Sequence, residues 1–62
     1  MLRMLEVVGM SAKGFSDAVN NAVEELSKKG EKMHFFEVVE QRGAVRDGKI
    51  REYQVKLKVA VE

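Results

Sequence analysis

The chain has 62 residues and a formal net charge of +1, from eleven basic and ten acidic residues that are interspersed along it. This length allows one domain at most, residues 1–62, and a domain this small buries only about 60% of its unfolded surface. Cysteine is absent, which excludes disulfides and thiolate metal sites and leaves association between subunits as the way to gain stability.

The charge balance excludes the broad basic footprint of a nucleic-acid-binding protein. The apolar runs are too short for a membrane span or a signal peptide, so a cytoplasmic location is expected.

A short strand is predicted over residues 2–9, because apolar and other residues alternate there before Gly9. A helix of about four turns is predicted next, with Ser11 as one candidate N-cap and Ser16 as a later one. Gly30 is predicted to end it, after cations that suit the last turn. Apolar residues recur at spacings of three and four and form one stripe: Phe15, Ala18, Val19, Ala22, Val23 and Leu26.

Two long strands are predicted to complete the chain. The first covers residues 32–42, and Asp47-Gly48 is a pair typical of tight hairpin turns. The second strand alternates, with Tyr53, Val55, Leu57, Val59 and Val61 on one face and Gln54, Lys56, Lys58 and Ala60 on the other. The sequence therefore predicts an α+β fold of order β-α-β-β, a three-stranded antiparallel sheet packed on one helix.

The stretch MHFFEVVEQRG, residues 33–43, places Phe35 beside Phe36 in a predicted strand. Neighbouring strand residues point to opposite faces of a sheet, so only one of these rings faces the helix. The other ring must be covered by something outside the chain's own core. The alternation alone leaves open which of the two it is.

The segments EVVGMS, FSDAVNNAVEEL, FEVVEQRG and EYQVKLKV, in this order, closely resemble those of the dodecins over nearly the whole chain. The resemblance implies a small flavoprotein that assembles into a hollow dodecamer and binds riboflavin or FMN in pairs at subunit interfaces. It further implies a storage protein rather than an enzyme.

Three residues acquire expected roles from this resemblance. Phe35 occupies the position of the aromatic residue, usually tryptophan, that stacks on the isoalloxazine ring. Gln54 corresponds to the glutamine that hydrogen-bonds the polar edge of the ring, and Arg42 to the arginine that helps to hold the phosphate of FMN. Arg42 also has an alternative role, as an ion-pair partner of Glu40, Asp47 or Glu52.

Phenylalanine in place of tryptophan is a departure from the family pattern, and we expect it to weaken stacking by on the order of tenfold. The sequence also ends at Val61-Glu62, where many relatives continue with an aromatic and a basic residue, so one phosphate contact is expected to be missing. Some dodecin-like proteins that lack the tryptophan are associated with calcium. The alternative is therefore an assembly without flavin, in which Glu37, Glu40 or Glu52 gather at symmetry axes and bind calcium or another small ligand.

No pattern in the sequence predicts catalysis. Ser11, Ser16 and Ser27 lie at predicted helix ends, where capping explains them. The segment from Gly9 to Gly14 is followed by Phe15, so it lacks the lysine-serine pair that follows the second glycine of a phosphate-binding loop. His34 has no second histidine with which to share a metal.

Overall fold

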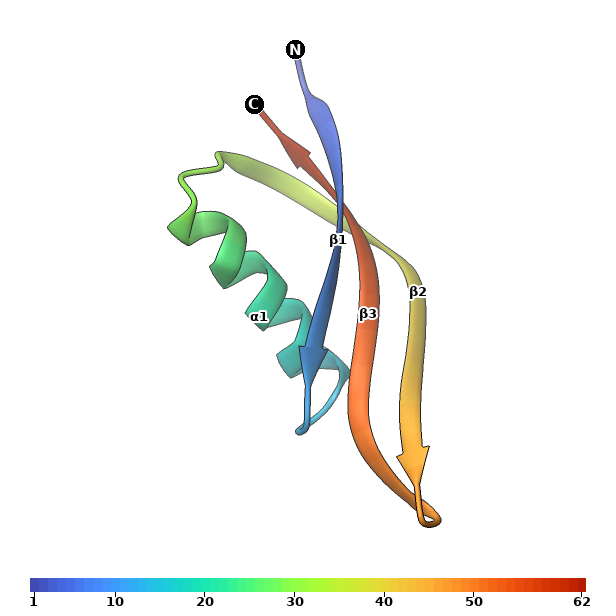
Figure 1. Cartoon of the computed structure of the whole chain (residues 1–62). Coiled ribbons are helices and arrows are strands. Elements are labelled where there is room, and N and C mark those ends of the chain that lie inside the picture. Colours follow the sequence, from blue (N-terminus) through green and yellow to red (C-terminus); the bar gives the residue numbers. More distant parts are fainter.

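The computed structural model describes residues 1–62. Its elements are, in chain order, β1 (Arg3–Ser11), α1 (Phe15–Lys28), β2 (Met33–Arg46) and β3 (Lys49–Val61). The strands form one antiparallel sheet in the order β1-β3-β2, and α1 packs on one face of it (Figure 1). The predicted α+β class and β-α-β-β order are confirmed.

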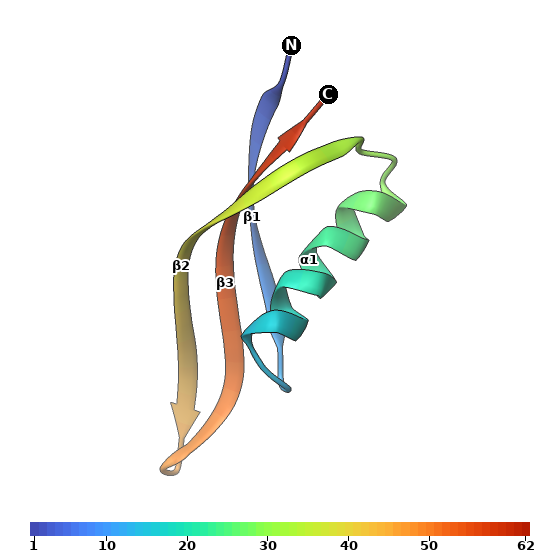
Figure 2. The ribbon, with the colours of Figure 1, turned by 180° about the vertical axis from the view of Figure 1, so that it is seen from behind.

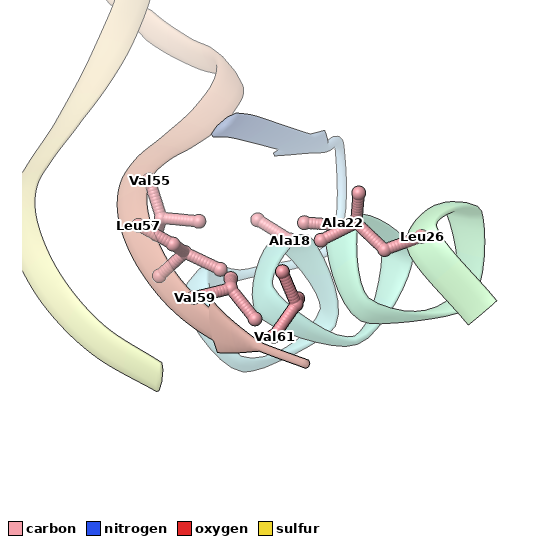
Figure 3. Close-up of a cluster of buried hydrophobic side chains, with 7 residues drawn as sticks. All are labelled: Ala18, Ala22, Leu26, Val55, Leu57, Val59 and Val61. Atoms are coloured by element: carbon pink, nitrogen blue, oxygen red, sulfur yellow. The ribbon is translucent and has the colours of Figure 1, made fainter. Parts of the chain in front are cut away.

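The core lies between α1 and the central strand β3. Alternate side chains of β3 point at the helix, as the sequence predicted, and meet the apolar stripe of α1 (Figure 3). Within that stripe the flanking valines and Phe15 are only half-buried. The buried cluster consists of Ala18, Ala22, Leu26, Val55, Leu57, Val59 and Val61.

The start of α1 differs from the prediction, because no side chain caps it. The N-cap position is Gly14, which makes no side-chain hydrogen bond, so neither Ser11 nor Ser16 is the cap. Ser11 is instead the last residue of β1, and its hydroxyl accepts a hydrogen bond from the Lys13 backbone N–H (2.9 Å) and donates one to Asp17 Oδ2 (2.6 Å) in the first turn of α1.

The end of α1 confirms the predicted role of Gly30. This residue has a φ of 85°, in the left-handed region that glycine adopts without strain. Its N–H binds the carbonyl of Ser27 (3.0 Å), and the next N–H, of Glu31, binds the carbonyl of Leu26 (3.1 Å). These two bonds form a Schellman motif, which satisfies the last carbonyl groups of the helix.

The β2–β3 hairpin closes at the predicted Asp47-Gly48 turn. Both residues have positive φ (54° and 74°), the signature of a type I′ turn, whose twist matches that of the strands. Pairing continues to Arg46 and Lys49, so β2 extends four residues beyond the predicted end at Arg42. The tip of the hairpin therefore projects past the start of α1 (Figure 2).

The helix covers the sheet unevenly. It packs mainly on β1 and β3, and every residue of β2 except Met33 is exposed. The helix α1 has neither the length nor the apolar character of a membrane-spanning segment.

Candidate functional site

The face of the sheet that points away from α1, called the outer face here, is built from rows of residues paired across the three strands. Alternate residues of β3 run down its middle, and each has a partner on β1 and on β2. The four rows, written from β1 through β3 to β2, are Met4–Ala60–Phe35, Glu6–Lys58–Glu37, Val8–Lys56–Glu40 and Met10–Gln54–Arg42. All three predicted site residues thus lie on the outer face.

The strand register decides which phenylalanine faces the helix. Phe36 is paired with Val59, a core residue, whereas Phe35 is paired with Ala60 on the outer face. Ala60 is fully buried although it points away from the helix, because the larger Phe35 and Met4 flank it. Phe35 itself is 50% exposed, so the ring that lacks a partner within the chain is Phe35.

A β-bulge in β2 brings Arg42 onto the face of Phe35. Phe35 and Arg42 are separated by an odd number of positions, so simple alternation places them on opposite faces. The register shifts between Val38 and Glu40, and the additional residue, Val39, moves all later side chains of β2 to the other face. Gln41 consequently lies on the helix side, where it lines a groove with Phe15.

Gln54 and Arg42 are hydrogen-bonded to each other. Arg42 Nε donates to Gln54 Oε1 at 2.7 Å, and Gln54 Nε2 donates to Glu52 Oε1, also at 2.7 Å. Glu52 and Gln54 are two residues apart on β3, so their side chains share the outer face. Of the ion-pair partners that the sequence left open for Arg42, Glu40, Asp47 and Glu52, none pairs with it directly, and Glu52 is linked to it through Gln54.

The structure separates Phe35 from this polar group. Phe35 is paired with Ala60 on β3, and Arg42 is paired with Gln54. Ala60 and Gln54 are six residues apart, which corresponds to about 20 Å along a strand. Beside Gln54 and Arg42 lies a shallow cavity of about 90 Å³, also lined by Val8, Glu40 and Lys56. Sites for cofactor-sized ligands usually occupy roughly 300–1,000 Å³, so this cavity beside Gln54 and Arg42 is by itself too small for a flavin.

The carboxylates considered for a metal are dispersed. Glu37 and Glu40 are paired in register with Lys58 and Lys56, and Glu52 is held by Gln54. No group of three or more histidine, aspartate or glutamate side chains lies close enough together within the chain to hold a metal ion.

A charged cluster near Phe35 was not predicted. Glu62 Oε2 accepts a hydrogen bond from His34 Nε2 (2.9 Å), and Glu62 Oε1 forms an ion pair with Lys32 (3.4 Å). These residues meet because the end of β3 runs beside the start of β2, where the Glu62 N–H binds the Lys32 carbonyl. The antiparallel pairing of the two strand ends is the signal from which this cluster could have been inferred.

Comparison with known proteins agrees with this arrangement. The dodecin family model matches residues 1–62. The curated dodecin of Thermus thermophilus is 35% identical over 57 residues, which cover 92% of this chain and 83% of that protein.

Solved dodecin structures have the same fold. The dodecin of Streptomyces coelicolor matches with a TM-score of 0.94 and 41% identity, covering 98% of this chain and 87% of that one. A tryptophan-to-phenylalanine mutant of the T. thermophilus dodecin matches with a TM-score of 0.92 and 34% identity, covering 98% and 91%. A calcium-chelating dodecin of Mycobacterium tuberculosis matches with a TM-score of 0.85 and 28% identity, covering 97% and 86%. The protein described here belongs to the dodecin family.

Proposed function

We propose that this protein binds riboflavin or FMN and stores the flavins, stacked in pairs, between the subunits of a dodecamer. Family membership supports this function. The observation that carries it is Phe35, a half-exposed aromatic ring on the sheet face that its own helix does not cover. The resemblance assigns this position to the residue that stacks on the isoalloxazine ring.

The binding site requires more than one subunit. A flavin ring system is shorter than the roughly 20 Å that separate Phe35 from Gln54 along the sheet, so one ring cannot contact both residues of the same chain. We therefore propose that Phe35 of one subunit and Gln54 of a neighbour contact the same flavin. The small buried core also favours assembly, because only 10 of the 62 residues are buried in the isolated chain.

Arg42 is the proposed contact of the FMN phosphate. Its Nε is occupied by Gln54, but the terminal guanidinium N–H groups remain available, and these are the donors that bind phosphate in a bidentate manner. Riboflavin lacks the phosphate and depends on stacking and on Gln54 alone. A difference in affinity between the two flavins is therefore the measure of the contribution of Arg42.

Storage, rather than catalysis, is the proposed role. The serine placed beside a carboxylate, Ser11, is only 8% exposed, and its hydroxyl joins Asp17 to the turn before α1. That is a structural arrangement at the start of the helix. We propose that the flavin is a stored ligand and not the cofactor of a reaction on a second substrate.

A fluorescence titration of the apo-protein with riboflavin and with FMN tests the proposal. We expect saturable quenching near one flavin per subunit, and tighter binding of FMN if Arg42 contacts the phosphate. Phe35→Leu should abolish most of the quenching, whereas Phe36→Leu is the matched control on the helix side of the same strand. Undiminished fluorescence at saturating protein would contradict the stacked geometry.

Calcium binding by a flavin-free assembly is the second candidate, and the relative from M. tuberculosis that is described as calcium-chelating supports it. Hard cations bind oxygen ligands, yet Glu37 and Glu40 lie opposite lysines within one chain. A calcium site would therefore combine carboxylates from several subunits. Calorimetric binding of calcium by protein that does not quench flavin would favour this candidate.

A further inference from the structure

Glu52, Gln54 and Arg42 form a continuous chain of hydrogen bonds on the outer face. Both bonds are 2.7 Å long, from Arg42 Nε to Gln54 Oε1 and from Gln54 Nε2 to Glu52 Oε1. Glu52 and Gln54 are both half-buried, and Arg42 reaches Gln54 from the neighbouring strand β2. The amide of Gln54 is thus held from two sides by charged groups of opposite sign.

We propose that Glu52 is a positioning residue, which together with Arg42 fixes the Gln54 amide in one of its two orientations. The oxygen and nitrogen ends of an amide have nearly the same shape, so packing alone does not distinguish them. A guanidinium only donates hydrogen bonds and an ionised carboxylate only accepts them. If the amide were reversed, its NH₂ group would face the Nε–H of Arg42 and its oxygen would face the carboxylate of Glu52. Neither pair can form a hydrogen bond.

The fixed amide retains one unused donor and one unused acceptor. Gln54 Nε2 carries a second N–H, and Oε1 has a second lone pair. They stand in a fixed order, with the acceptor on the side of Arg42 in β2 and the donor on the side of Glu52 in β3. The amide therefore matches a ring edge on which an N–H and a carbonyl are adjacent, presented in a single orientation.

The free N–H and the free lone pair of Gln54 define the ligand more narrowly than stacking on Phe35 does. This inference rests on the proposed flavin site. The pyrimidine side of the isoalloxazine ring carries an N–H between two carbonyl groups, as in a cyclic imide. Phe35 accepts any flat aromatic face, because stacking tolerates many ring systems. Gln54 then discriminates between planar ligands through its hydrogen bonds. The size of the resulting difference in affinity depends on how firmly Glu52 holds the amide.

The first test compares binding of riboflavin and of 3-methylriboflavin, in which a methyl group replaces the imide hydrogen. For the unmodified protein we expect riboflavin to bind about tenfold more tightly, the loss expected when a buried hydrogen bond is left unmade. Glu52→Gln keeps the shape of the side chain but both donates and accepts, so the preference should fall to about two- to threefold. Glu24→Ala, which removes an exposed carboxylate on α1, should leave the preference unchanged.

A purely structural role of Glu52 would weaken both ligands in proportion and leave their ratio intact. An unchanged ratio in Glu52→Gln would therefore overturn the proposal even if absolute affinities fell.

The second test needs no ligand and separates this inference from the flavin proposal. The chain has two glutamines, Gln41 and Gln54, so selective ¹⁵N labelling of glutamine side chains gives two pairs of amide proton signals by NMR. In the ligand-free protein the Gln54 proton that binds Glu52 should lie downfield and return upfield in Glu52→Gln, while the Gln41 signals stay in place. Unchanged Gln54 signals would overturn the positioning role; absent flavin binding with the expected shift would overturn only the flavin proposal.

Discussion

Gly9 is the residue at which sheet and helix approach most closely. A Cβ added there would lie 2.9 Å from the Ala22 Cβ and closer still to the carbonyl oxygen of Ala18. Neither neighbour can move without displacing the backbone of α1. The closeness of α1 to β1 thus depends on the absence of a side chain at this position.

We expect Gly9→Ala to destabilise the protein by roughly 1–3 kcal/mol, the usual cost of overpacking. Gly14→Ala is the control, because no atom lies within 4 Å of its added Cβ, and at this N-cap position it should cost less than about 1 kcal/mol. Urea unfolding at fixed protein concentration measures both. Equal midpoints for the two variants would show that α1 can shift to accept the methyl group.

Phe35 carries the second prediction at the level of single residues. Phe35→Trp enlarges the stacking surface and adds an electron-rich indole on the exposed outer face. We expect flavin affinity to increase by about five- to tenfold, which is about 1 kcal/mol of added stacking, and residual flavin fluorescence to decrease. Phe36→Trp, on the helix side, should improve neither quantity. Identical quenching by the Phe35→Trp variant and the unmodified protein would place the flavin away from this residue.

The sequence correctly predicted the ends of helices and strands that are set by individual turn-forming residues. The stop of α1 at Gly30 and the turn at Asp47-Gly48 each follow from residues that adopt positive φ. The predicted start of α1 was wrong, because the Ser11 hydroxyl binds the Lys13 N–H and the Asp17 side chain instead of capping the helix. The predicted end of β2 at residue 42 was also wrong. Pairing with β3 continues to Arg46, and the length of a strand depends on how far its partner strand runs beside it.

The β-bulge at Val39 is the feature of the candidate site that could least be predicted from the sequence. No residue type marks that position, yet the bulge determines that Arg42 shares a face with Phe35 and that Gln41 does not. The resemblance named Phe35, Gln54 and Arg42 without indicating their distances. The link through Glu52 was missed because it depends on a cross-strand register that alternation leaves undetermined.

The hairpin turn fixes the register that places Gln54 beside Arg42, and Gly48 can be tested there. Its φ of 74° is strained for any residue with a Cβ, although no atom lies within 4 Å of the added carbon. Gly48→Ala should therefore cost about 1–2 kcal/mol for conformational reasons alone. Asp47→Asn, at a φ of 54°, should be nearly neutral, since asparagine tolerates this region. Thermal unfolding distinguishes them, and an equal loss in both variants would argue against a type I′ turn.

At the scale of the whole molecule, the isolated chain leaves much of its apolar surface uncovered. The helix packs on β1 and β3 and leaves β2 exposed on both faces. Exposed apolar area of this extent is typical of an interaction surface, and a 62-residue chain gains little stability from its own core. The exposed large apolar residues are Met1, Leu2, Met4, Val8, Met10, Phe35, Phe36, Val38, Val39, Val45 and Ile50.

If folding and assembly are coupled, the midpoint of thermal unfolding must rise with protein concentration by mass action. Between 1 and 100 μM protein we expect a rise of roughly 10–20 °C, because a hundredfold change in concentration adds about 2–3 kcal/mol per subunit in a large oligomer. Sedimentation on the same samples should show a species far heavier than the 7.0 kDa chain. Val39→Asp, at a residue 48% exposed in the single chain, should lower both the mass and the midpoint, whereas Lys13→Ala makes the same change of charge and should alter neither. A concentration-independent midpoint together with a 7.0 kDa species would contradict assembly and, with it, a flavin site shared between Phe35 and a neighbour's Gln54.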